Sequence, residues 1–285
     1  MSLGKTTGMK EPLAAQVKGL YAPETIIFWK ALQVVFWIVG IALLLFMIFM
    51  PPLGVTLFWN ILIPVAPAIF VLATGFWRNV CPLGTTALLP DKLGLSRGKK
   101  LTSSQRTTLN LVGIIFLLAI IPLRHLLFNN SGQATVVVIL MLGAYAIISG
   151  FIYERKSGWC SGICPVHAVE KLYGGNVAFS LPNAHCNECV KCSVPCPDST
   201  PNISPLATSK SKTGKAIEIL LVGGFPGYIW GWFQVPDYSA SFGWSAFLTA
   251  YSYPILGGAA TIILYLVIKK VFKKLDKRII ASLFA

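Results

Sequence analysis

The chain has 285 residues, of which 55% are hydrophobic and only 12% are charged. This composition excludes an ordinary soluble domain and indicates a membrane protein. The formal net charge is +14, because 24 Lys and Arg outnumber 10 Asp and Glu. An excess of basic residues can indicate nucleic-acid binding. Here the basic residues follow the order of the hydrophobic segments, so we expect no nucleic-acid partner.

Six hydrophobic segments are long enough to cross a bilayer, which takes about 20 helical residues. They cover residues 27–50, 53–76, 109–128, 134–153, 216–235 and 244–268. The first 25 residues lack the hydrophobic region of a secretory signal, so the first segment is expected to stay in the membrane. The predicted fold class is therefore an all-α polytopic membrane protein with six transmembrane helices.

The basic residues fall on one side of these segments. Of the 24 Lys and Arg, 22 lie before the first segment, in residues 77–108, in residues 154–215 or after the sixth segment. The intervening loops, near Pro51, at residues 129–133 and at residues 235–243, contain none. By the positive-inside rule both termini and both large loops face the cytoplasm. We expect a multi-pass protein of the inner (cytoplasmic) membrane, in contact with lipid.

A Cys-Pro dipeptide follows both the second and the fourth segment. When Cys81-Pro82 is aligned with Cys164-Pro165, Trp77 stands opposite Cys160, and a D/E-K-L sequence follows in each copy. This pattern indicates a duplicated unit of two spans and a Cys-Pro turn, with one cysteine missing from the first copy.

Residues 185–197 read H-C-N-E-C-V-K-C-S-V-P-C-P and carry the other four cysteines, Cys186, Cys189, Cys192 and Cys196. The spacing C-x2-C-x2-C-x3-C-P is the bacterial ferredoxin signature for a [4Fe–4S] cluster. Zinc sites usually pair two distant C-x2-C arms, which fits this spacing poorly. All seven cysteines lie in predicted cytoplasmic segments, where disulfides are rare and metal binding is common. We therefore predict an iron–sulfur site.

Glycine and proline interrupt the last two hydrophobic segments, at G-G-F-P-G (residues 223–227) and at Pro254 with Gly257-Gly258. These residues predict kinks, and the alternative is a break that forms a cavity for a quinone head group or a partner's helix. After the sixth segment, apolar residues recur at helical spacing opposite Lys and Arg, which predicts an amphipathic helix on the inner leaflet. Its apolar residues are Phe272, Leu275, Ile279 and Leu283.

The chain thus divides into five parts. Residues 1–26 form a cytoplasmic N-terminus, 27–153 a four-helix membrane part with a Cys-Pro loop at 77–108, 154–215 a small ferredoxin-like iron–sulfur insert on the cytoplasmic side, 216–268 a membrane hairpin, and 269–285 an amphipathic basic tail. The insert is polar and lacks clear periodicity, so we expect a bound cluster to organise it.

The several spans, the C-x3-C-P sequence at a span end and the ferredoxin signature resemble the membrane-bound polyferredoxins of the NapH and NosR kind. The resemblance covers residues 53–200. It implies electron transfer between membrane quinol and respiratory partners, and related members serve in copper-oxidase maturation. The chain departs from that pattern in having one ferredoxin signature where relatives carry two, and Trp77 where they have a cysteine.

Two [4Fe–4S] clusters need eight ligands, and the chain has seven cysteines. In one arrangement Cys164 completes the cluster of Cys186, Cys189 and Cys192, and another group joins Cys196, Cys160 and Cys81. In a second, one cluster takes Cys81, Cys160, Cys164 and Cys196, and the other adds His185, His167 or Asp198 to three cysteines. In a third there is one cluster, and Cys81 and Cys160 are spectators. We expect at least one cluster and favour two.

Two of the non-cysteine candidates have simpler roles open to them. His167 can cap the short helix after Cys164, and His185 can donate a hydrogen bond that tunes the cluster potential.

Arg124 and His125 lie in the third hydrophobic segment, where charged groups are rare and default to a functional hypothesis. They are candidates for a quinone site near the outer face. The alternative is that Arg124 extends to the membrane surface.

We assign no catalytic residue to this chain. The sequence favours a membrane-anchored electron-transfer subunit of an oxidoreductase complex, which relays single electrons between cytoplasmic-side [4Fe–4S] clusters and a quinone pool or a partner redox protein. The alternatives are an assembly or maturation reductase for another metalloprotein, and a structural subunit whose cluster orders the complex. In each case we expect other subunits as partners.

Overall fold

The computed structural model describes residues 23–173, 179, 205–206, 209–238, 243–272 and 276–284. In this part the chain is almost entirely helical, and its only strand-like pairing is an isolated bridge between Lys99 and Tyr153. Five helical stretches are long and apolar enough to cross a membrane, namely Ile27–Phe49, Pro51–Ala73, Ser103–Phe128, Gly132–Ile152 and Trp244–Val271. The prediction of an all-helical, multi-pass membrane protein is confirmed for these five. The predicted fifth span, residues 216–235, is not among the five; it and the ferredoxin-like insert remain predictions.

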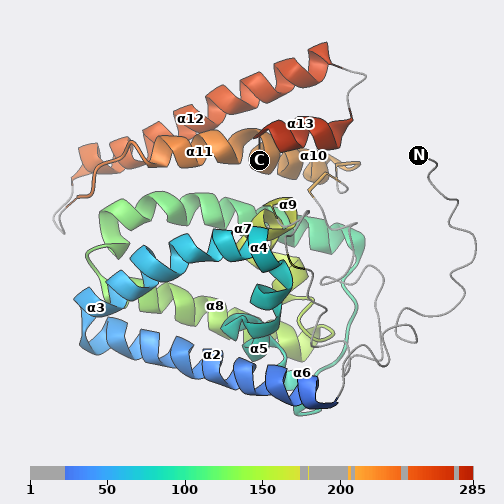
Figure 1. Ribbon diagram of the computed structural model, residues 1–285. Helices are drawn as coiled ribbons and strands as arrows, with labels where there is room; N and C mark the ends of the chain where they lie inside the picture. The colour runs from blue at the N-terminus through green and yellow to red at the C-terminus, as the bar shows by residue number, and fades with distance from the viewer. Residues whose placement is uncertain are drawn as a thin grey trace, which may run out of the picture.

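The first pair of spans is a tight helical hairpin. Helix α2 (Pro23–Phe49) leads through a one-residue turn into α3 (Pro51–Val55), the wider π-helical turn η1 (Thr56–Leu62) and α4 (Ile63–Val80). The turn requires glycine at position 54, because a Cβ there would lie 2.4 Å from the backbone nitrogen of Met47. Helix α2 packs against both α4 and α8 (Figure 1).

The second pair of spans consists of α7 (Ser103–Leu123), the π-helical turn η2 (Arg124–Phe128) and α8 (Gly132–Ile152). Helix α7 begins six residues before the predicted span because Thr102 and Gln105 form a capping box, in which each side chain accepts a hydrogen bond from the other's backbone N–H. The Oγ of Ser131 caps α8 by accepting from the Ala134 N–H at 3.2 Å.

Short helices follow both pairs at the same end of the bundle, which we call the cysteine end. Helices α5 (Pro82–Ala87) and α6 (Leu89–Lys92) follow α4, while η3 (Trp159–Ile163) and α9 (Pro165–Tyr173) follow α8 (Figure 1). A Cβ at Gly113 would lie 2.3 Å from the Ile163 carbonyl oxygen, and one at Gly150 would lie 2.4 Å from that of Ala87. These contacts hold both sets of short helices tightly against α7 and α8.

The third pair of helices forms a layer of its own beside α7 (Figure 1). Helix α10 (Lys212–Glu218), η5 (Ile219–Gly224) and α11 (Phe225–Trp232) follow one another without a gap, and α12 (Trp244–Val271) returns alongside them. The π-helical turn η5 interrupts the segment predicted as the fifth span. A hydrophobic cluster fixes this layer to the bundle at the cysteine end, through Ile114, Ala168, Ile217 and Leu221.

The glycines of α11 allow it to approach α12 very closely. A Cβ at Gly227 would lie 2.2 Å from the carbonyl oxygen of Gly257, and one at Gly231 would lie 2.2 Å from that of Tyr253. Small residues four apart are a common device for close helix packing in membranes. The glycines therefore serve helix contact in this hairpin.

The C-terminal helix α13 (Lys277–Phe284) packs back onto this layer. Ile280 and Ala281 are buried against Val222 and Tyr265, whereas Ile279 and Leu283 are exposed. The exposed apolar side chains suit the predicted contact with lipid. Leu275 lies outside the described residues.

The close contact predicts that Gly227→Val weakens the hairpin. Overpacking costs about 1–3 kcal/mol, and here the clash is with backbone that cannot rotate away. We expect the apparent melting temperature in detergent to fall by several degrees. Gly243→Ala is the matched control, because a Cβ there meets nothing within 4 Å. Equal melting temperatures for the two variants would contradict the packing argument.

Candidate metal centre

The three described cysteines come together at the cysteine end. Cys81, Cys160 and Cys164 line one small cavity with Trp77, His167 and Glu170. None of these three cysteines is in a disulfide. The two Cys-Pro turns, which the sequence separates by more than eighty residues, thus converge on one place.

The two Cys-Pro turns share a backbone geometry as well as a sequence. Cys81 has φ −55° and ψ 118°, and Cys164 has φ −55° and ψ 115°. In each case proline follows at the first helical position, where its fixed φ suits the helix and its missing N–H costs no hydrogen bond. The backbone therefore supports the internal repeat.

Each turn aims backbone N–H groups at its cysteine sulfur. The N–H groups of Leu83 and Gly84 donate to Cys81, and those of Val166 and His167 donate to Cys164. Burial nevertheless raises the pKa of Cys81, and raises that of Cys164 to about 12. Both groups are therefore thiols when alone. A bound metal reverses this balance, because coordination deprotonates the thiol.

Cys160 brings a second sulfur beside that of Cys81. A Cβ built on Gly84 would lie 3.8 Å from the Sγ of Cys160 and 3.9 Å from the Sγ of Cys81. Both sulfurs thus lie within van der Waals contact of a Cβ at position 84. Cys160 itself lies in η3, where the Cys164 N–H bonds five residues back to the Trp159 carbonyl at 2.9 Å.

A buried charged network borders the same cavity. The Nε of Arg78 donates to Oε1 of Glu170, and Oε2 of Glu170 lies 3.8 Å from Nδ1 of His167. Burial lowers the pKa of His167 against the opposing effect of Glu170. Burial alone would raise the pKa of Glu170, but His167 and Arg78 bring it below its usual value. The Glu170 carboxylate thus lies between Arg78 and the His167 imidazole.

Two polar atoms at the cavity have no hydrogen-bond partner in the described part of the protein. They are Nε2 of His167 and Nε1 of Trp159, and their residues are 4% and 2% exposed. Buried polar atoms are almost always hydrogen-bonded, so each unpartnered one calls for an explanation. A bound group that contacts these nitrogens would supply it.

Within the described ranges, no group of three or more His, Cys, Asp or Glu side chains is placed to hold a metal ion. In a [4Fe–4S] cluster each cysteine binds a different iron. The ligand atoms of such a cluster are therefore further apart than the ligand atoms of a single metal ion. Buried thiols, backbone N–H donors and a nearby imidazole are the surroundings that hold and tune iron–sulfur clusters. The donor set at the cysteine end is of that kind.

The remaining candidates in this region lie outside the described residues. They are the four cysteines of the ferredoxin signature, Cys186, Cys189, Cys192 and Cys196, together with His185 and Asp198. Of the three non-cysteine candidates, the structure describes His167.

The sequence analysis passed over Arg78 and Glu170. They lie 92 residues apart in the chain and meet through the folding of α4 against α9. Each lies close to a Cys-Pro turn, Arg78 three residues before Cys81 and Glu170 six residues after Cys164. Opposite charges beside two repeated turns are the signal that would have identified the pair.

Arg124 is held by protein groups at the opposite end of the bundle. Its guanidinium carbon lies 5.8 Å from the ring centre of Trp59 and 5.3 Å from that of Trp232, and its Nη2 donates to Asn60 Oδ1 at 2.8 Å. Such cation–π contacts are favourable where the cation is partly removed from water. Arg124 therefore joins the first hairpin to the α11–α12 layer.

His125 is paired with a carboxylate at the same place. Its Nδ1 lies 2.6 Å from Oδ1 of Asp237, which also accepts from Asn129 Nδ2 at 2.7 Å. The other ring nitrogen of His125 is buried without a partner in the described part of the chain. The structure thus brings the two predicted quinone-site residues into one polar cluster. Along α7, Arg124 lies eleven residues, or about 16 Å, from Gly113, which contacts Ile163 next to Cys164.

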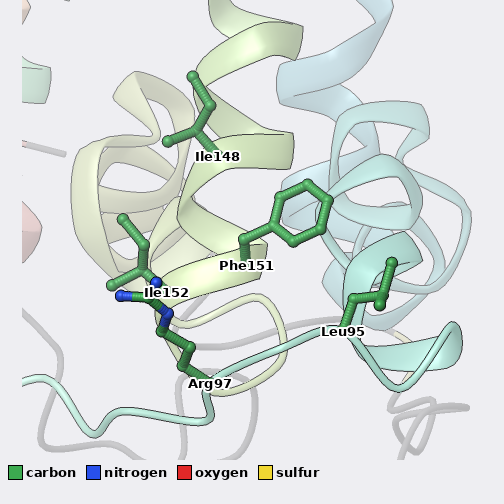
Figure 2. Close-up of a pocket in the computed structure, with 5 residues that line it drawn as sticks. All are labelled: Leu95, Arg97, Ile148, Phe151 and Ile152. Atoms are coloured by element: carbon green, nitrogen blue, oxygen red, sulfur yellow. The ribbon is translucent and has the colours of Figure 1, made fainter.

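An open hollow of about 460 Å³ lies at the cysteine end of α8, and the sequence analysis did not identify it (Figure 2). Ile148, Phe151 and Ile152 of α8 line it together with Leu95 and Arg97 from the loop after α6. The backbone N–H of Arg97 donates to the Phe151 carbonyl at 2.8 Å. Apolar walls with one basic side chain suit an amphipathic molecule from the membrane.

Comparison with known proteins adds no assignment. No protein-family model, no curated protein and no solved structure matches the chain. The resemblance to membrane-bound polyferredoxins is therefore an expectation based on the motifs alone.

The charged network predicts that Glu170→Ala destabilises the cysteine end. The change removes the buried carboxylate that Arg78 contacts on α9, and breaking a buried pair costs about 3–5 kcal/mol. We expect a clear fall in the melting temperature of the protein purified in detergent. Asp91→Ala is the control, because Asp91 makes no ion pair in the described ranges. A Glu170→Ala protein as stable as the control would show that the pair is dispensable.

Proposed function

We propose that the protein is a membrane-anchored iron–sulfur electron-transfer subunit. It relays single electrons between [4Fe–4S] clusters at the cytoplasmic side of the inner membrane and a quinone pool or a partner redox protein. The observation that carries the proposal is the convergence of Cys81, Cys160 and Cys164 on one buried cavity, beside an unpartnered His167 nitrogen. The ferredoxin signature at residues 185–197 supports it independently.

The residues of the chain have separable tasks in this proposal. The cysteines of the two Cys-Pro turns hold one cluster, and the ferredoxin signature holds the other. The cluster itself supplies the capacity to gain and lose one electron. Backbone N–H groups of α5 and α9 stabilise the negative thiolates, and burial keeps water away from them. The chain makes and breaks no substrate bonds.

Two places on the protein are candidates for quinone contact. The Arg124–His125 cluster lies eleven residues along α7, or about 16 Å, from Gly113, which contacts Ile163 next to Cys164. The hollow at Arg97 lies at the same end of α8 as the cysteines (Figure 2). Direct quinone contact, where it occurs, takes place at one of these two.

Anaerobic purification with quantification of iron and acid-labile sulfide tests the proposal. We expect about eight of each per chain, since each [4Fe–4S] cluster has four irons and four sulfides. Reduction should produce an electron paramagnetic resonance signal of [4Fe–4S]⁺ type. Zinc in place of iron would overturn the proposal. Iron–sulfur clusters that neither quinol nor dithionite reduces would favour the structural-subunit alternative.

The convergence of the cysteines predicts that Cys81→Ser and Cys160→Ser each lower the iron content from about eight to about four per chain. The ferredoxin-signature cluster should remain, since its own cysteines are intact. Ser161→Ala is the matched control: it changes a fully buried side chain in the same turn as Cys160 without removing a thiol. If both cysteine variants kept the wild-type iron content, Cys81 and Cys160 would not be ligands.

A further inference from the structure

The two Cys-Pro turns supply three cysteine ligands at the cysteine cavity, one fewer than a [4Fe–4S] cluster takes. A complete pair of C-x3-C-P turns would supply four cysteines, but Trp77 occupies the first position of the first copy. Trp77 lines the same cavity as the three cysteines. An iron–sulfur cube of the proposed kind takes four protein ligands, so the fourth must come from elsewhere.

The alignment of the two repeat copies indicates which residue can act as the missing fourth ligand. Aligning Cys81 with Cys164 places Gly84 opposite His167, each the third residue after its cysteine. In the first copy Gly84 leaves space beside the sulfurs of Cys81 and Cys160. In the second copy the equivalent position carries an imidazole, which lines the same cavity.

The environment of His167 leaves one ring nitrogen ready to bind a metal. Its side chain is 4% exposed, and Nδ1 lies 3.8 Å from Oε2 of Glu170, beyond hydrogen-bond distance. With the proton on Nδ1, the ring nitrogen that faces the carboxylate, the lone pair lies on Nε2. Metal-ligating histidines usually have a carboxylate or a carbonyl on the side of the other ring nitrogen, as here. Nε2 has no other partner in the part of the chain that the structure describes.

The other carboxylate oxygen of Glu170 contacts Arg78. Arg78, at the end of α4, donates to Glu170, so the order Arg78–Glu170–His167 runs from one copy of the repeat to the other. Both Glu170 and His167 lie on α9, three residues apart, so the carboxylate and the imidazole are on the same face of one helix.

We propose that Nε2 of His167 is the fourth protein ligand of an iron–sulfur cluster held by Cys81, Cys160 and Cys164. This inference rests on the proposed function, because it names a ligand of the same centre. Seven cysteines and His167 then supply eight ligands for two clusters. Cys196 stays with Cys186, Cys189 and Cys192.

Histidine ligation has a consequence for the redox potential. A neutral imidazole in place of a thiolate makes the cluster one charge less negative, which favours the reduced form. Histidine ligands raise the potential of Rieske clusters for the same reason. The centre at the Cys-Pro turns is therefore the higher-potential member of the pair, and electrons at equilibrium reside there first.

The experiment is pulsed electron paramagnetic resonance on reduced full-length protein that carries ¹⁵N only in histidine. The chain has three histidines, so His125→Ala and His185→Ala serve as matched controls. We expect a strong ¹⁵N coupling to one cluster, present in both controls and absent from His167→Ala. In His167→Cys we expect iron to stay near eight per chain, the ¹⁵N coupling to vanish and the potential of that cluster to fall. This variant keeps the test valid if His167→Ala does not fold.

The other results each overturn the inference. A ¹⁵N coupling that survives in His167→Cys but disappears in His185→Ala would assign the ligand to His185. Two clusters without a strong ¹⁵N coupling would exclude histidine ligation, and loss in Cys196→Ser of the same cluster that is lost in Cys81→Ser would make Cys196 the fourth ligand. Failure of the proposed function looks different, because the wild-type protein would then contain no iron–sulfur cluster.

Discussion

Burial opposes the ionisation of the cysteines at this end of the protein, raising the pKa of Cys81 and bringing that of Cys164 to about 12. Thiolates in such a place need compensating positive charge or hydrogen-bond donors. The backbone supplies part of this through the N–H groups at the start of α5 and α9. Under the proposed function, a multiply charged metal centre supplies the rest, at the cavity where both helices begin with Cys-Pro.

The rest of the bundle keeps the two turns together. Backbone contacts at Gly113 and Gly150 seat η3 and α5 against α7 and α8, so neither turn can move without disturbing a span. The Arg78–Glu170 pair then ties α4 to α9 across the repeat. At the opposite end, Arg124 between Trp59 and Trp232 connects the third helical layer to the first hairpin. The protein is thus fixed at both ends by polar contacts and along its length by glycine-mediated packing.

The parts of this structure that depend on local signals could be predicted from the sequence. The five long spans follow from continuous hydrophobicity, and the equivalence of Cys81 and Cys164 follows from the repeated Cys-Pro dipeptide. The contact between Arg78 and Glu170 could not be predicted, because it joins residues 92 positions apart whose helices meet only after packing. Likewise, hydrophobicity alone could not show that η5 interrupts the predicted fifth span, because the π-helical turn leaves composition unchanged.

The central claim is that the two Cys-Pro turns hold a cluster of their own, and its location can be measured directly. The measurement is an anomalous difference map at the iron absorption edge, from crystals of the anaerobically purified protein. The account predicts a strong iron peak bounded by the sulfurs of Cys81, Cys160 and Cys164, with a second peak at the ferredoxin signature. Iron at the signature alone, with those three sulfurs contacting only protein, would contradict it.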